Sequence, residues 1–224
     1  MKLAVLEELR AARGAGRAVA LATWLDGSDS RVVGPTHAGE LGDAVRTALR
    51  TDEATVVTTT AGDVLVEPHN PPIRLVIIGA VHVAQPLAEM ARLTGFTVTI
   101  VDPRRSWASA ERFPGLALVT EWPDVALEAL KLDARCAVVA LTHDPKLDDP
   151  GLVVALRSPA FYIGCLGSKK THAGRRERLA AAGFDTATLD RLHGPVGLSI
   201  HAKSPAEIAV SILAEIVATL RGGS

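Results

Sequence analysis

Five lysine and arginine residues cluster between positions 169 and 178, directly after an apolar run. The run Phe161–Leu166 leads into Gly167-Ser168-Lys169-Lys170-Thr171, and the polar stretch that follows carries Arg175, Arg176 and Arg178. This order predicts a strand, a Gly-Ser turn and the basic start of a helix, which together present backbone N–H groups and cationic side chains to one anion. Cations at a helix N-terminus oppose the helix dipole, and a bound anion would offset that cost. The predicted anion-binding residues are Gly167, Ser168, Lys169, Lys170 and Thr171.

A second polar segment, Thr142–Asp148, also follows an apolar run. Ligands of open parallel sheets bind beyond the carboxyl ends of the strands, so we expect His143, Asp144 and the more distant His82 to share one crevice with the basic segment. A metal site at His143, Asp144 and Asp148 is an alternative, but one histidine with two carboxylates is a weak signature, and we predict no metal. Asp144 could instead cap its own turn through backbone N–H groups.

A third segment has the layout of a dinucleotide-binding turn. Gly79 ends an apolar strand, and Asp102 ends the next strand, 23 positions later. The second glycine of the usual pattern is replaced by Val81, whose methyl groups would lie where phosphate oxygens approach the backbone, and Pro86 removes a further donor. Two hypotheses remain: an NAD(P)-dependent oxidoreductase that uses Gly79 and Asp102, or a Rossmann scaffold that keeps only the shape. The Asp102–Arg105 segment could take a ribose and a phosphate, or could be a solvated loop.

Composition excludes several classes of protein. The chain has 224 residues, 48% of them apolar, and a net charge of −1, which favours neither nucleic acid nor an acidic membrane surface as a partner. No leader or membrane segment is visible, so we expect a cytoplasmic protein. Cys136 and Cys165 lie in apolar runs and are expected to be buried and unreactive. We find no Ser-His-Asp spacing, nucleophile elbow or paired carboxylates, so we predict binding and name no catalytic residue.

The proline-rich segment Glu67–Pro72 separates two predicted domains. Residues 1–70 are expected to form a small α+β unit. Its predicted helices are Leu3–Arg13 and Gly39–Arg50, and its predicted strands are Arg17–Trp24, Ala54–Thr60 and Asp63–Glu67.

Residues 73–224 alternate strands and helices, which predicts an α/β fold with a Rossmann-like, doubly wound parallel sheet. Predicted strands are Arg74–Gly79, Thr97–Val101, Leu116–Val119, Cys136–Leu141 and Phe161–Leu166; predicted helices are Val83–Leu93, Val125–Lys131 and Pro150–Arg157. The last helix has Ser204 as N-cap, Pro205 at its first position, Glu207 closing a capping box, and Gly222-Gly223 at its end.

Four motifs occur in order across residues 74–221. They are Leu141-Thr-His143-Asp144-Pro-Lys-Leu-Asp148; Tyr162-Ile-Gly164-Cys-Leu-Gly167-Ser168-Lys-Lys-Thr171; Gly194-Pro195-Val-Gly197-Leu198; and Ser204-Pro205-Ala-Glu207-Ile208-Ala209 with Ala214-Glu215-Ile216. This set resembles the XdhC/CoxI family of accessory factors for the maturation of xanthine dehydrogenase and carbon monoxide dehydrogenase.

The resemblance implies a dimer-forming, cytoplasmic chaperone with a Rossmann-like carboxyl-terminal domain. Such a protein binds molybdenum cofactor (molybdopterin), protects it, helps to present it for sulfuration by a cysteine desulfurase, and delivers it to a molybdenum hydroxylase client. In this hypothesis Ser168, Lys169, Lys170 and Arg175 hold the pterin phosphate. The complete set of candidate cofactor-binding residues is Gly79, His82, Asp102, His143, Asp144, Gly167, Ser168, Lys169, Lys170 and Thr171.

The chain departs from the family pattern at two places. The usual Gly-Ala-Gly-His turn is Gly79-Ala80-Val81-His82 here, which disfavours a bound dinucleotide. The amino-terminal domain of the family carries a Ser-Gly-Gly-Cys-Val-Glu segment, whereas this chain has the shorter, cysteine-free Val33–Glu40. If that thiol handles the cofactor in relatives, this chain lacks it, and its client need not be xanthine dehydrogenase.

Overall fold

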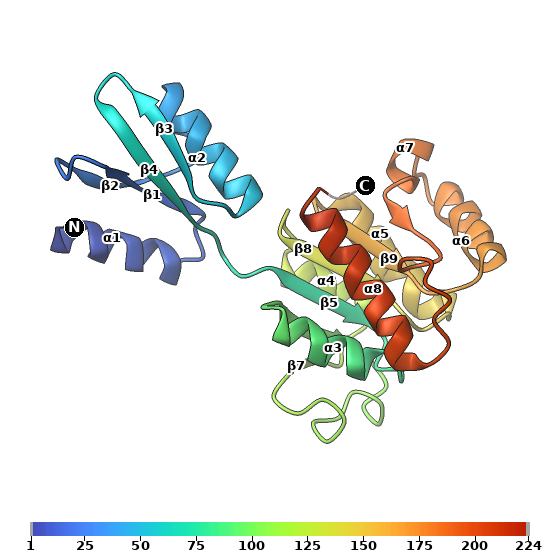
Figure 1. Cartoon of the computed structure of the whole chain (residues 1–224). Helices are drawn as coiled ribbons and strands as arrows, with labels where there is room; N and C mark the ends of the chain where they lie inside the picture. Colours follow the sequence, from blue (N-terminus) through green and yellow to red (C-terminus); the bar gives the residue numbers. More distant parts are fainter. Residues whose placement is uncertain (1, 223–224) are drawn as a thin grey trace. The chain divides into compact units, whose positions relative to one another are not determined.

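The computed structural model describes residues 2–222, and the chain divides between Pro71 and Pro72 into two compact units (Figure 1). The first unit is a four-stranded antiparallel sheet in the order β2-β1-β4-β3. Its elements are α1 (Leu3–Gly14), β1 (Val19–Trp24), β2 (Ser30–Val33), α2 (Gly39–Thr51), β3 (Thr55–Thr59) and β4 (Gly62–His69).

Side chains alternate across the first sheet, so each face meets a different helix. Ala20, Ala22 and Trp24 pack with α2, while Val19 packs with Leu9 of α1. Strand β2, which was not predicted from the sequence, has only four residues and lies at the edge of the sheet. Such a short edge strand carries too little alternation to be recognised from its residues alone.

The second unit has the predicted Rossmann-like fold. All six of its strands are parallel, in the order β10-β9-β8-β5-β6-β7. Its elements are β5 (Arg74–Ile78), α3 (Ala84–Leu93), β6 (Thr97–Val101), β7 (Ala117–Val119), α4 (Pro123–Leu130), β8 (Cys136–Ala140), α5 (Pro145–Arg157), β9 (Tyr162–Cys165), α6 (Lys169–Ala181), α7 (Thr186–Leu189), β10 (Leu192–His193) and α8 (Pro205–Leu220).

Helices cover both faces of the parallel sheet, which explains why its central strands are continuous apolar runs. One face packs against α3 and α8, and the other packs against α4 and α5 (Figure 1). The predicted capping box of α8 is present, with Ser204 and Glu207 bonded reciprocally. Ile212 and Ile216 are fully buried on its inner face. The predicted helix end is present at Gly222, whereas Gly223 lies outside the described residues.

The main differences from the prediction in the second unit are the start of one helix and two short additional elements. Helix α5 begins at Pro145, not Pro150, because the Asp144 carboxylate accepts the Lys146 N–H and Pro145 occupies the first helical position. The alternative role of Asp144 as a cap is therefore confirmed. Helix α7 and strand β10 were not predicted, since they have four and two residues.

Both cysteines are buried and free, as predicted. Burial raises the pKa of Cys136 to about 11 and that of Cys165 to about 12. Because the thiolate is the reactive form, neither side chain is an effective nucleophile near neutral pH.

Candidate functional site

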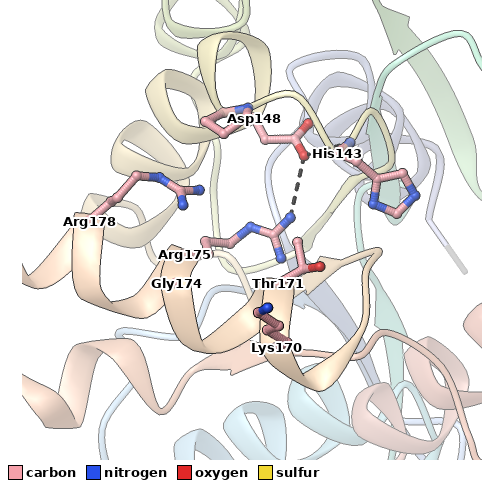
Figure 2. A pocket seen from close by; sticks show the side chains of 8 residues that line it. His143, Asp148, Lys170, Thr171, Gly174, Arg175 and Arg178 are labelled. Carbon is pink, nitrogen blue, oxygen red and sulfur yellow. Dashed lines mark hydrogen bonds and ion pairs between the residues drawn. The ribbon is translucent and has the colours of Figure 1, made fainter.

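A pocket of about 300 Å³ lies beside the amino-terminal halves of helices α5 and α6 (Figure 2). We call it the α5–α6 pocket. Its lining residues come from the loop after β8 and from the two helices: His143, Pro145, Asp148, Lys170, Thr171, Gly174, Arg175 and Arg178. The pocket thus joins the two polar segments that were predicted to lie beyond neighbouring strands.

Helix α6 supplies the cationic wall of the α5–α6 pocket. Ser168 is the N-cap of α6, and its hydroxyl accepts the Thr171 N–H at 3.1 Å. From this start, positions 170, 174 and 178 share one face, and positions 171 and 175 lie beside them, because helical neighbours are three or four residues apart. This spacing aligns Lys170 and Arg178 along the pocket.

Arg175 points from α6 toward Asp148 of α5 (Figure 2). Both residues are only 1% exposed, and the Arg175 Nη2 atom lies 3.5 Å from Asp148 Oδ2 and 3.2 Å from the Leu166 carbonyl oxygen. The Nε and Nη1 atoms of Arg175 are buried and have no hydrogen-bond partner within residues 2–222. A buried guanidinium with unsatisfied donors is costly, so this arrangement favours a ligand that supplies acceptors.

Asp148 ties the loop after β8 to the same pocket. Its carboxylate accepts the Thr142 hydroxyl at 2.6 Å and the His143 N–H at 3.1 Å. Burial raises the pKa of Asp148, although Thr142 and Arg175 oppose the change. His143 has a left-handed backbone with φ of 61°, and the hydrogen bond from its N–H to Asp148 helps to hold that conformation.

The remaining cations of α6 differ in their partners. Arg176 is paired with Asp190 at 2.7 Å, and Arg178 is paired with Asp149 at 2.5 Å. Within residues 2–222, the ammonium groups of Lys169 and Lys170 make no hydrogen bond or ion pair. Lys170 lines the pocket and Lys169 does not. Of these two adjacent lysines, only Lys170 therefore adds its positive charge to the wall of the pocket.

The structure therefore brings only part of the predicted anion-binding set to the pocket. His143, Lys170 and Thr171 line it, whereas Asp144 and Ser168 serve as helix caps. Gly167 has a positive φ of 146°, and a Cβ there would lie 3.1 Å from Thr171 and 3.7 Å from His143 Nδ1. Gly167 thus allows the loops after β8 and β9 to approach each other.

Side chains of the protein itself form hydrogen bonds with the backbone of the turn after β5. Asp102 is fully buried, and its two oxygens accept the Ala80 N–H at 2.8 Å, the Arg104 N–H at 2.9 Å and the Arg104 guanidinium at 2.7 and 2.9 Å. Burial alone would raise the pKa of Asp102, but the hydrogen bonds from Arg104 and Ala80 outweigh it and lower the pKa. Both oxygens of Asp102 are thus engaged by the protein and are not directed to a ribose.

Other groups close the same turn. Arg112 donates to the Ala80 carbonyl oxygen at 2.7 Å, so both backbone polar groups of Ala80 are engaged. Val81 packs against the hydrophobic core. His82 is exposed, lies edge-on to Trp107 at 6.3 Å and does not line the α5–α6 pocket. This geometry gives no support to the alternative of an NAD(P)-dependent oxidoreductase.

Gly79 has a packing role in this structure. Its φ is +101°, and a Cβ at this position would lie 2.4 Å from the Thr142 Cγ2 atom. The Thr142 hydroxyl donates to Asp148, which lines the pocket. The turn after β5 therefore packs against a residue that helps to hold Asp148 in place.

Several lining residues were not predicted from the sequence. The sequence indicated Asp148 only as a possible metal ligand and Arg178 only as one cation of the basic stretch, and it gave no indication of Gly174. The helical spacing of Lys170, Gly174 and Arg178 is a signal that could have identified them. Within residues 2–222, no group of three or more His, Cys, Asp or Glu side chains is placed to hold a metal ion. In the same range, no helix combines the length and apolar character needed to cross a membrane.

Comparison with known proteins identifies the domain that carries this pocket. The family model described as the XdhC Rossmann domain matches residues 75–216, which includes every residue that lines the α5–α6 pocket. A crystal structure described as a xanthine dehydrogenase from Bacillus halodurans has a TM-score of 0.72 and 27% sequence identity; the match covers 98% of this chain and 64% of that chain.

Two curated relatives carry informative names. A protein of Bacillus subtilis strain 168, named as a probable subunit of xanthine dehydrogenase, is 35% identical over 66% of this chain and 43% of its own length. The molybdenum cofactor insertion chaperone PaoD of Escherichia coli K12 is 31% identical over 65% of this chain and 40% of its own length. The matches with these two relatives therefore span less than half of their lengths.

Proposed function

Because this chain belongs to the XdhC family, we propose that it is an accessory factor that binds molybdenum cofactor and aids the maturation of a molybdenum hydroxylase. One observation of the structure carries the proposal: the buried Arg175, with two unpartnered nitrogen atoms, at a cationic pocket of the Rossmann unit. The name of PaoD supports molybdenum cofactor as the ligand. The two names that mention xanthine dehydrogenase support a molybdenum hydroxylase as the enzyme that receives it.

The residues of the α5–α6 pocket suit a phosphorylated pterin. Lys170 and Arg175 would hold the phosphate through charge-assisted hydrogen bonds, which are about twice as strong as neutral ones. His143 borders the same pocket and could contact the adjacent part of the cofactor. Both cysteines are buried, so sulfuration, if it occurs on this protein, draws its sulfur from a partner such as a cysteine desulfurase. A cytoplasmic homodimer is part of the same proposal.

The test is protection and delivery of the cofactor. Isolated molybdenum cofactor is incubated with the full chain, and its ability to activate a cofactor-free molybdenum hydroxylase is measured over time. We expect the cofactor to remain active longer with this protein than with bovine serum albumin at the same concentration. An equal rate of decay in the two samples, with no cofactor retained after gel filtration, would refute the proposal.

A further inference from the structure

We propose that the α5–α6 pocket recognises the terminal phosphate monoester of its ligand and excludes the internal diphosphate of a dinucleotide. The assignment of that phosphate to a pterin rests on the proposed function. The choice of a phosphate monoester rests on charge, donors and volume in the pocket itself.

The charge of the site matches a dianion. The cations that border the pocket are Lys170, Arg175 and Arg178, and the carboxylates that form ion pairs with them are Asp148 and Asp149. Three positive and two negative charges leave a net charge of +1, and the N-terminus of α6 adds about +0.5. A phosphate monoester carries about −1.5 to −2 at neutral pH, whereas each phosphate of a diester linkage carries about −1.

Several hydrogen-bond donors at the site have no acceptor in the part of the chain that the structure describes. Arg175 is 1% exposed, and its Nε–H and Nη1 groups have no acceptor among the described residues. Lys170 adds an ammonium group without a partner among residues 2–222. A terminal phosphate offers three acceptor oxygens to such donors. A buried guanidinium with two unpartnered nitrogen atoms distinguishes the site from an ordinary helix N-terminus.

The volume limits what can enter. About 300 Å³ is at the lower end of the range for small-molecule sites, which extends from about 300 to 1,000 Å³. The pocket therefore holds one end of a ligand, and the remainder must lie outside it. A dinucleotide would need the turn after β5 for its diphosphate, and there Asp102 and Arg112 already engage Ala80.

The experiment measures binding of inorganic phosphate to the full chain by isothermal titration calorimetry. We expect saturable binding that Lys170→Ala weakens about 10-fold or more, because the variant removes a charge-assisted hydrogen bond to the phosphate. The matched control, Lys169→Ala, changes a neighbouring lysine outside the pocket and should alter the dissociation constant less than about 2-fold.

A second variant separates binding from folding. At Gly174 a Cβ would meet only the Arg178 Nη1 atom, at 3.7 Å, so Gly174→Leu should fold, and leucine is the better helix former. Its side chain would occupy space that borders the pocket. We expect an unchanged or raised melting temperature together with a loss of phosphate binding. Retention of wild-type phosphate affinity in this variant and in Lys170→Ala would overturn the proposal.

Competition identifies the class of phosphate. AMP, a phosphate monoester, should compete with inorganic phosphate, whereas NAD, which has only an internal diphosphate, should not. Competition by NAD that depends on Lys170 would contradict this inference, and so would the absence of any phosphate binding. Neither result would refute the proposed function, which the cofactor-protection experiment tests separately. Conversely, phosphate binding at Lys170 in a protein that neither retains nor protects the cofactor would refute the proposed function alone.

Discussion

The buried pair of Asp148 and Arg175 makes a quantitative prediction about stability. Removing one partner of a buried ion pair costs about 3–5 kcal/mol, because the other charge remains buried. Asp148→Ala would leave Arg175 with only the Leu166 carbonyl oxygen as a partner, and it would also free the Thr142 hydroxyl. We therefore expect a loss of about 3–5 kcal/mol in the free energy of unfolding of the second unit.

A double-mutant cycle separates the pair from the other contacts of Asp148. Arg175→Met removes the charge while keeping an unbranched apolar side chain, and the double variant leaves no buried charge at this position. Residues in direct contact show coupling energies of about 0.5–3 kcal/mol, so the double variant should lose less stability than the sum of the single variants. The missing contacts of Asp148 with Thr142 and His143 should leave a residual loss in the double variant.

The assay is urea unfolding followed by tryptophan fluorescence in a Trp24→Phe background. Trp107 and Trp122 then remain as reporters, and both belong to the second unit. A loss below about 1 kcal/mol for Asp148→Ala, or strict additivity of the two single variants, would refute the argument that the buried charges depend on each other.

Three further predictions follow from other contacts. Gly79→Ala should lower the free energy of unfolding by about 1–3 kcal/mol, because its Cβ would lie 2.4 Å from Thr142; a change below about 0.5 kcal/mol in urea unfolding would show that the turn relaxes freely. Gly164→Ala should cost a similar amount, since its Cβ would lie 2.5 Å from a methyl group of Val196, and thermal unfolding by circular dichroism would detect it. The pKa of Asp102 is lowered from its ordinary value of 3.8, so the stability that Asp102 contributes is present above that pH and is lost as the pH falls through the lower folded-state pKa. Asp102→Asn should therefore flatten the acid side of the stability profile below about pH 5, and identical slopes for the two proteins would contradict this.

The predictable part of the fold is the part in which local signals agree. The strands of the second unit are continuous apolar runs, and α8 has a complete capping box, so their residues specify them without tertiary information. Short elements such as β2 and β10 carry no such local signal, since they form only by pairing with longer strands. The prediction that α5 starts at Pro150 is wrong because Asp144 and Pro145 form the stronger start signal, and Pro150 lies inside the helix.

The candidate site was predicted less completely than the fold. The sequence indicated the two loops, and the structure joins them at one pocket through His143, Lys170 and Thr171. Asp144 and Ser168 are N-caps, a common role for aspartate and serine. The sequence alone does not distinguish a capping side chain from one that binds a ligand. Whether the Nε and Nη1 atoms of Arg175 find acceptors depends on how α6 packs against α5, which no local pattern specifies.

The most direct test of the proposed site is a crystal structure of the full chain with isolated molybdenum cofactor bound. We predict that the terminal phosphate lies against Arg175 and Lys170 in the α5–α6 pocket, with the turn at Ala80 still closed by Asp102. A phosphate bound instead to the backbone of the Gly79–Ala84 turn, with Asp102 displaced from Ala80, would contradict this prediction.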